Sequence, residues 1–172
     1  MRSLRCDNLD MITVTSTTAI ESVAELARQI WTQHFVPIIG ESQVEYMLAS
    51  IQSPAAITQQ IAQGYEYFLV MEQGAPIGYC AIVHDPKTAA TQLSKIYVLP
   101  EEQGSGRGTH ILSFVETHCR EQGAKRLWLT VNRHNAAAIG FYQSRGFEIT
   151  DTMVQSIGEG FVMDDYIMSK TI

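Results

Sequence analysis

The chain has 172 residues, with 12 Lys and Arg against 18 Asp and Glu, which gives a formal net charge of -6. This length suits one domain, expected over residues 1–172, because a second core would leave two halves too small to be stable. Hydrophobic residues make up 45% of the chain, and no segment supplies the ~18 consecutive apolar residues of a membrane span. Composition therefore excludes a disordered chain and a membrane protein. The acidic balance argues against nucleic-acid binding and is compatible with a cationic substrate.

The amino-terminal segment and the cysteines indicate a reducing compartment. The first residues lack the apolar block and cleavage site of a signal peptide, so a cytoplasmic location is expected. Cys6, Cys80 and Cys119 form an odd, widely spaced set, which favours reduced thiols buried as small hydrophobic residues over a disulfide framework. The histidines show no metal-ligand spacing and no Cys pair accompanies them, so no metal site is expected.

The first third of the chain is predicted to be mostly helical after one strand. A β-branched, alternating segment is typical of that strand, and the spacing from Thr18 to Glu21 is that of a capping box that opens a helix. Pro37 and Gly40 are expected to break this helix. The predicted elements are a strand over residues 11–15 and helices over 18–34, 42–50 and 54–63.

From residue 65 on, strands alternate with helices and glycines mark the turns. Gln73-Gly74 indicates a hairpin turn, and Gly123 and Gly146 indicate helix ends. The predicted strands cover 67–71, 77–83, 92–99, 127–131, 147–156 and 161–168, and the predicted helices run from about 111 to 123 and over 136–145. A parallel crossover beside antiparallel hairpins predicts a mixed sheet of the α/β (α+β) class.

The most informative segment is a strand that runs into glycines and then into a helix. Gly104, Gly106 and Gly108 stand between the two elements. Glycines allow positive φ and close backbone approach, and the first turn of a helix presents unpaired N–H groups with a partial positive charge. The loop is therefore predicted to bind a phosphate-bearing ligand, with Arg107 as an added cation. A loop whose glycines only turn the chain is the alternative.

Other catalytic and phosphate-binding motifs do not fit. No Lys-Ser/Thr pair follows the glycines as in a P-loop, and Thr109 stands where a dinucleotide fingerprint starting at Gly104 needs its third glycine. The chain has no G-x-S-x-G elbow and no Cys/His pairing for a covalent intermediate, so direct group transfer is expected.

Two segments resemble the GNAT superfamily of N-acetyltransferases. Residues 103–108 match its acetyl-CoA loop, [QR]-x-x-G-x-[GA], at each defined position. Asn135, Ala138 and Tyr142, followed by Gly146-Phe147, are similar to the family's N-x-x-A-x-x-x-Y…GF segment. The resemblance implies a mixed, mostly antiparallel central sheet of about seven strands, flanked by helices, with splayed fourth and fifth strands. The carboxyl-terminal residues also look like those of bacterial relatives of polyamine acetyltransferases.

The same resemblance implies an acetyl-CoA site. The loop backbone would hold the pyrophosphate, the fourth strand would pair with pantetheine as with an added strand, and Asn135 would hydrogen-bond the cosubstrate. Capping of the following helix is the alternative role for Asn135. The cofactor-binding residues so assigned are Ile96, Tyr97, Val98, Gln103, Gly104, Ser105, Gly106, Arg107, Gly108, Thr109 and Asn135.

Tyr142 matches the tyrosine that the family commonly places beside the cofactor sulfur as the general acid. A positioned phenol helps the thiolate to leave when an amine attacks the thioester. The alternative is that Tyr142 only packs beside Phe141 and Phe147.

The family's usual general base has no counterpart in this sequence. Many members carry a Glu on the fourth strand, whereas residues 92–95 hold no carboxylate. The other carboxylates of the chain are expected on solvated faces. An ordered water relay is therefore as good a candidate for the general base as any of them. The carboxylates weighed as substitutes are Glu66, Glu72, Glu159, Asp164 and Asp165.

These observations predict an acetyl-CoA-dependent N-acetyltransferase that acts on a primary amine by direct attack in a ternary complex. The acceptor is expected to be a small molecule such as a polyamine, or a peptide amino group, with no nucleic-acid or membrane partner. Edge strands and an exposed carboxyl-terminal hairpin permit a homodimer. The alternatives are a non-catalytic CoA-binding or regulatory module and a nucleotide-phosphate binder that uses the same loop.

Overall fold

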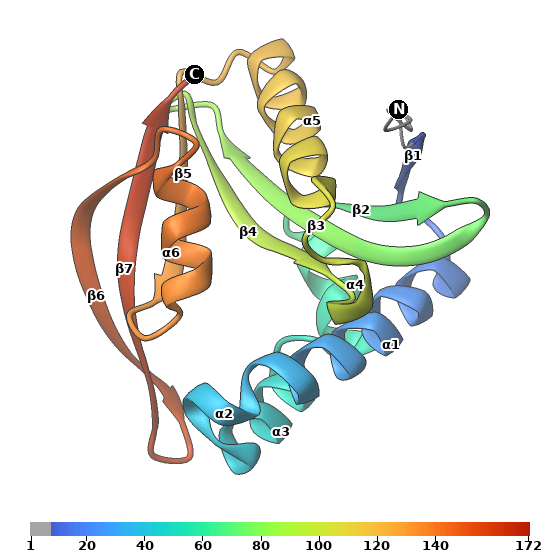
Figure 1. The fold of residues 1–172 in the computed structure, drawn as a ribbon, viewed down its shortest axis with the longest axis vertical. Helices are drawn as coiled ribbons and strands as arrows, with labels where there is room; N and C mark the ends of the chain where they lie inside the picture. The colour runs from blue at the N-terminus through green and yellow to red at the C-terminus, as the bar shows by residue number, and fades with distance from the viewer. Residues whose placement is uncertain (1–7) are drawn as a thin grey trace, which may run out of the picture.

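The computed structural model describes residues 8–172, which form a seven-stranded sheet with helices on both faces (Figure 1). The strand order is β1-β2-β3-β4-β5-β7-β6. All neighbouring strands are antiparallel except β4 and β5, which are parallel. The predicted mixed, mostly antiparallel sheet is confirmed. Cys6 lies outside the described residues.

The elements follow the predicted order closely. The strands are β1 (Leu9–Thr13), β2 (Tyr65–Glu72), β3 (Ala75–Asp85), β4 (Ala90–Val98), β5 (Arg126–Asn132), β6 (Glu148–Gly158) and β7 (Phe161–Thr171). The helices are α1 (Thr17–His34), α2 (Val36–Ile39), α3 (Glu41–Ser50), α4 (Pro54–Ala62), the 3-10 turn η1 (Pro100–Glu102), α5 (Arg107–Glu121) and α6 (Ala136–Gln143). None of the described helices is long and apolar enough to cross a membrane.

The first helix differs from its prediction at the amino end. Ser16 is the N-cap, because its extended backbone lets its Oγ accept a hydrogen bond from the Ala19 N–H at 3.1 Å. Thr18, predicted to be the cap, lies inside the helix. α1 ends at His34 as predicted, but Pro37 stands in the first turn of α2, where its missing N–H is not needed.

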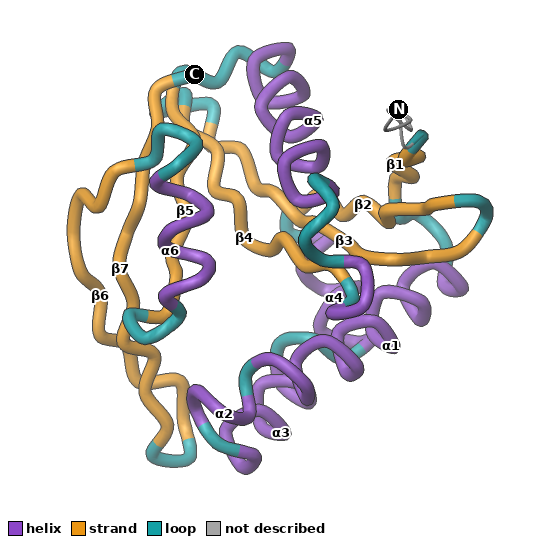
Figure 2. The backbone as a smooth tube through the Cα atoms, in the orientation of Figure 1, coloured by secondary structure: helices purple, strands orange, loops and turns teal. Residues whose placement is uncertain are grey.

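Apolar side chains fill both faces of the sheet. On one face α5 and α6 contribute residues such as Ile111 and Tyr142 to the core. On the other face α1, α3 and α4 contribute residues such as Ile30, Val44 and Ile57. Figure 2 shows the helices in these two groups on either side of the strands. The sheet is therefore held in place from both sides.

The sheet opens between β4 and β5. Only Ala90–Gln92 pair with residues 126–128, and beyond these three pairs the strands diverge toward α1, α2 and α3 (Figure 1). The predicted splay of the fourth and fifth strands is confirmed. Since β-strands cannot pair across this gap, backbone groups of β4 and β5 border the space between the two halves.

β4 also carries an irregularity. Ala81 pairs with Lys95 and Ile82 with Leu93, so Ser94 is an extra residue in the ladder. The extra residue reverses the alternation of side chains, which places Leu93 in the core under α5 and turns Lys95 toward α4, where it contacts Gln60.

Candidate active site

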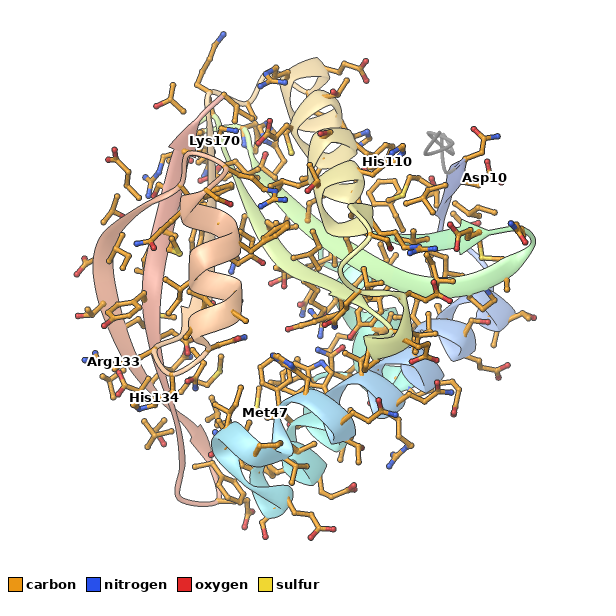
Figure 3. All side chains as sticks on the ribbon, in the orientation of Figure 1. Asp10, Met47, His110, Arg133, His134 and Lys170 are labelled. Carbon is orange, nitrogen blue, oxygen red and sulfur yellow. The ribbon has the colours of Figure 1, made fainter. Side chains whose placement is uncertain are left out.

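A cavity of about 970 Å³ lies in the gap between β4 and β5. We call one part the loop end, lined by Gly104, Gly106, Thr109 and α6, and the other part the helical end, lined by α1, α3 and the facing strands β5 to β7. Figure 3 shows Met47 on the side of α3 that faces this gap. The two ends belong to one continuous space.

The glycine loop opens α5 at the loop end. Gly104 and Gly106 both have a φ of 82°, a backbone conformation that glycine adopts at little cost. An added Cβ on Gly108 would lie 3.2 Å from Cε2 of Phe141, so the first turn of α5 packs closely on α6. Because the first N–H groups of α5 have no partner within the helix, the loop offers an anion site to the cavity.

Arg107 is held on the outer side of this loop. Its guanidinium is 2.7 Å from Oε2 of Glu72 and 3.1 Å from Oε2 of Glu102, and it also bonds the Ser105 hydroxyl. Its side chain is 15% exposed, and Arg107 is not among the residues that line the cavity. Two carboxylates therefore already balance its charge.

Arg145 supplies a cation at the loop end that sequence reasoning missed. Its Nε is 3.1 Å from the Thr109 hydroxyl, an Nη donates to the Phe141 carbonyl at 3.0 Å, and its guanidinium lies 3.8 Å from the centre of the Phe141 ring. These contacts hold Arg145 in the cavity wall beside the glycine loop. The signal in the sequence was its position one turn after Tyr142.

The predicted pantetheine segment of β4 lies along the cavity. Ile96, Tyr97 and Val98 all line it and come after the last pair with β5. Gln103 also lines the cavity, and its side-chain N–H donates to the Val98 carbonyl at 3.1 Å. The edge of β4 that faces β5 is therefore open to an added strand-like ligand over Ile96 and Tyr97.

Tyr142 packs in the core and also lines the cavity. Its ring packs on Phe141 and Phe147 at centroid distances of 5.3 and 5.6 Å, and the residue also lines the cavity. Burial raises the pKa of its phenol, so the hydroxyl keeps its proton at neutral pH. Asn135 likewise caps α6, with its Oδ1 3.4 Å from the Ala138 N–H, and lines the cavity.

Three of the carboxylates weighed as a base have cationic or imidazole partners. Glu66 is 3.0 Å from Nε2 of His118, Glu72 is bonded to Arg107, and Asp164 is 3.0 Å from the Arg133 guanidinium. A fourth, Glu159, lies exposed in the turn between β6 and β7. None of the four lines the cavity.

Asp165 is the exception, and its expected position on a solvated face is wrong. It is 3% exposed and lines the cavity. The reason is register: β7 lies between β5 and β6, so Asp165 is paired with both Asn132 and Met153 in the interior of the sheet. Burial raises the pKa of its carboxyl to about 6, opposed by a hydrogen bond from Thr130 and reinforced by the charge of Asp164.

Lys95 is a second buried ionisable group that the sequence analysis did not single out. It is 5% exposed, and its ammonium is 2.9 Å from Oε1 of Gln60 and 5.3 Å from the centre of the Tyr67 ring. Burial lowers its pKa to about 8. The sequence signal was a lysine inside a strand that contains no other charged residue.

Cys80 and Cys119 are buried free thiols, in agreement with their predicted role as small hydrophobic residues. Burial raises the pKa of Cys119 to about 11, which keeps this thiol protonated and unreactive. Across residues 8–172, no three His, Cys, Asp or Glu side chains come together in a way that could hold a metal ion.

Comparisons with known proteins identify the family and the fold. A family model described as the acetyltransferase (GNAT) family matches residues 21–147. The chain therefore belongs to this family.

Similar sequences carry related names. An uncharacterised N-acetyltransferase of Mycobacterium tuberculosis is 31% identical over 99 residues, which cover 58% of this chain and 62% of that relative's length. The spermidine N(1)-acetyltransferase of Thermoplasma acidophilum is 24% identical over 150 residues, covering 84% of this chain and 89% of the relative.

Solved structures share the fold at low identity. The PaiA N-acetyltransferase of Thermoplasma acidophilum, in complex with coenzyme A, superposes with a TM-score of 0.81 at 20% identity and covers 96% of this chain and 99% of that one. A GNAT family acetyltransferase of Elizabethkingia anophelis with acetyl-CoA bound gives 0.64 at 17% identity, with 96% and 99% covered. Both likenesses show the fold.

Proposed function

We propose that this protein transfers the acetyl group of acetyl-CoA to a primary amine, by direct attack within a ternary complex. The observation that carries this proposal is the continuous cavity, which joins an anion-binding glycine loop at one end to a second, helix-lined end, with Tyr142 in its wall. A cavity of about 970 Å³ has room for more than one small group.

The residues at the loop end fit the chemical parts of acetyl-CoA. The N–H groups at the start of α5 and the guanidinium of Arg145 suit its phosphates, and the open edge of β4 at Ile96 and Tyr97 suits the amides of pantetheine. Asn135 lines the same wall and, beyond its cap, keeps a side-chain N–H₂ for the ligand. The remaining residues predicted for this site keep that role as part of the proposal, except Arg107, which is paired with Glu72 and Glu102 and does not line the cavity.

Tyr142 acts as the general acid in this proposal. As an amine nitrogen attacks the thioester carbon, the C–S bond breaks and the sulfur needs a proton. The phenol of Tyr142 is protonated at neutral pH because its burial disfavours the charged form, so it has a proton to give as charge develops on the departing sulfur.

We assign the helical end of the cavity to the second substrate, a small amine or a peptide amino group. The named relative from Thermoplasma acidophilum is a spermidine acetyltransferase, which makes a polyamine one candidate. The net charge of -6 also favours a cationic acceptor. This proposal also includes four expectations from the sequence: one domain, a cytoplasmic location, a homodimer, and no nucleic-acid or membrane partner.

Thermal unfolding with acetyl-CoA, CoA or ATP, followed by thiol release against a panel of amines, tests the proposal. We expect both CoA compounds to raise the melting temperature more than ATP does, because only they fill the loop and the edge of β4. Amine-dependent thiol release is expected in the same samples.

The alternatives give different outcomes. Stabilisation by CoA without thiol release on any amine would favour a non-catalytic CoA-binding module. A larger shift with ATP than with CoA would favour a nucleotide-phosphate binder and would contradict the proposal.

A further inference from the structure

The helical end of the cavity contains one buried carboxylate without a cationic partner. Asp165 is 3% exposed, and among residues 8–172 no Lys, Arg or His lies within ion-pair distance of it. The side chain of Thr130 forms a hydrogen bond with its carboxylate, which partly offsets the rise in pKa that burial causes. A buried carboxylate with so few partners is costly unless a cation joins it, which makes a ligand's ammonium its natural complement.

The walls around this carboxylate are apolar and aromatic. Trp31 of α1 and Phe35, the residue that follows this helix, pack on each other with ring centres 4.3 Å apart, and both ring centres lie within 6.0 Å of that of Tyr97. Other large apolar residues that line this end include Met47, Met153 and Met163. Aromatic faces and methionines accommodate the apolar body of a ligand and stabilise a nearby cation.

The charges in the cavity wall fit a single positive group. The lining contains two carboxylates, and the second, Glu102, is already paired with Arg107 at 3.1 Å. The lining also contains the cationic side chains of Lys95 and Arg145. The lining therefore offers no second unpaired carboxylate to the additional ammonium groups of a polyamine, and the two cationic side chains would repel them.

Asp165 and the proposed acid, Tyr142, both line the same cavity. Burial raises the pKa of the Tyr97 phenol, and Tyr142 and Asp165 raise it further, so both lie within electrostatic reach of Tyr97. The groups that face Asp165 are Thr130 and Asn132 on β5, Met153 on β6, Tyr97 on β4 and Asp164 beside it in the chain.

We propose that Asp165 binds the ammonium group of the acceptor and takes its first proton, and that the acceptor is a monoamine with an aromatic or apolar body. This inference deepens the proposed function and rests on it. It places the general base on β7, across the gap from β4, because β4 itself contains no carboxylate.

The proposed step conserves protons and bonds. Asp165 takes one proton from R–NH₃⁺, and the free amine attacks the thioester carbon, forming the C–N bond as the C–S bond breaks. Tyr142 gives its proton to the sulfur, and the second proton of the nitrogen restores the Tyr142 hydroxyl. Asp165 then releases its proton to water, so one acetamide, one thiol and one proton are produced.

The test compares Asp165→Asn with wild type in two measurements. Trp31 and Trp128 both line the cavity, so tryptophan fluorescence reports the binding of 2-phenylethylamine to the CoA-saturated protein without turnover. We expect the dissociation constant to rise about tenfold to hundredfold in the variant, as for loss of a hydrogen bond to a charged group. In steady state, kcat/KM for 2-phenylethylamine is expected to fall at least about hundredfold, while KM for acetyl-CoA stays unchanged.

The matched control is Asp151→Asn, an exposed aspartate on the neighbouring strand β6 that is not part of the cavity. We expect wild-type behaviour from it. A melting-temperature shift with CoA in Asp165→Asn shows that the variant is folded with its loop end intact. Spermidine is expected to be a poorer substrate and a weaker ligand than 2-phenylethylamine.

The inference would be overturned by equal affinity for 2-phenylethylamine in Asp165→Asn and wild type, or by an equal loss of affinity in Asp151→Asn. It would also be overturned if the wild-type protein acetylated spermidine with a higher kcat/KM than 2-phenylethylamine. Failure of the proposed function is separate, because it shows as an absence of thiol release from wild type with every amine. The fluorescence titration needs no acetyl transfer, so it decides the role of Asp165 in binding in either case.

Discussion

Asp165 makes the stability of the folded protein depend on pH in an unusual direction. Burial raises the pKa of its carboxyl from the ordinary range to about 6, so the folded protein holds this proton more tightly than the unfolded chain does. Its contribution to stability is therefore complete below the ordinary carboxyl pKa and is lost as the pH rises through about 6.

The variant Asp165→Asn is expected to remove this pH dependence. At pH 8 the charge in the wild-type core costs about 3 kcal/mol, so the variant should be more stable there by a similar amount and nearly unchanged at pH 4. Urea unfolding at the two pH values measures the difference. Asp151→Asn serves as the exposed control, and a variant that is less stable than wild type at pH 8 would contradict the expectation.

Tyr142 is expected to act through its hydroxyl while its ring supports the core. Tyr142→Phe keeps the packing against Phe141 and Phe147, so the melting temperature should change little. Loss of the acid should lower kcat by about 10²-fold to 10³-fold with little effect on KM for acetyl-CoA. Steady-state kinetics checks this, with Tyr166→Phe, a tyrosine outside the cavity lining, as the control. Full activity in Tyr142→Phe would assign the proton to another donor.

At the scale of elements, two arginines near the start of α5 and the end of α6 have different surroundings. Arg145 extends from just beyond α6 to Thr109 in the first turn of α5 and lines the cavity, whereas Arg107 joins the loop to Glu72 at the end of β2. One arginine is thus placed for a ligand and the other for the fold.

Replacing each arginine by glutamine should separate these tasks. Arg145→Gln is expected to weaken acetyl-CoA binding by about tenfold, through loss of a charge-assisted hydrogen bond to phosphate. Arg107→Gln is expected to lower the free energy of unfolding by about 1–2 kcal/mol, because it leaves two partly buried carboxylates without their cation. Calorimetric titration with CoA and urea unfolding of both variants check the pair of expectations. A larger loss of affinity in Arg107→Gln than in Arg145→Gln would reverse the assignment.

The elements themselves could be predicted because their signals are local. The glycine loop, the hairpin turn at Gln73-Gly74 and the helix end at Gly123 each depend on a few consecutive residues. The N-cap was harder, since Ser16 and Thr18 are both good caps and only the backbone angles at Ser16 decide between them.

The parts of the site that sequence reasoning missed depend on long-range register. Asp165 is buried because β7 inserts between β5 and β6, and no local pattern distinguishes it from the half-buried Asp164. Lys95 faces α4 because Ser94 is an extra residue in β4. Arg145 reaches the glycine loop only after α6 packs against α5. Such features require the assembled sheet before they can be assigned.

At the scale of the whole molecule, the two halves of the sheet are joined by few contacts around the cavity. β4 and β5 share three residue pairs at one end. At the other end, α3 meets the hairpin of β6 and β7, where the Tyr46 hydroxyl donates to the Ile157 carbonyl at 2.6 Å and Gln43 donates to the Val162 carbonyl at 3.0 Å. The ring of Tyr46 also packs on Phe161 at 5.3 Å. These contacts close the helical end of the cavity.

Tyr46→Ala is expected to loosen this closure without changing the loop end. Loss of the hydrogen bond and the ring contact should speed hydrogen exchange in residues 157–162, because local opening there then costs less free energy. KM for the amine should rise while KM for acetyl-CoA stays near its wild-type value, since α5 and α6 make no use of Tyr46. Hydrogen exchange and steady-state kinetics measure both effects, with Thr150→Ala at the opposite end of β6 as the control. Unchanged exchange in the hairpin would show that α3 does not hold the two halves together, and the wall of the helical end would then be fixed by β5 and β6 alone.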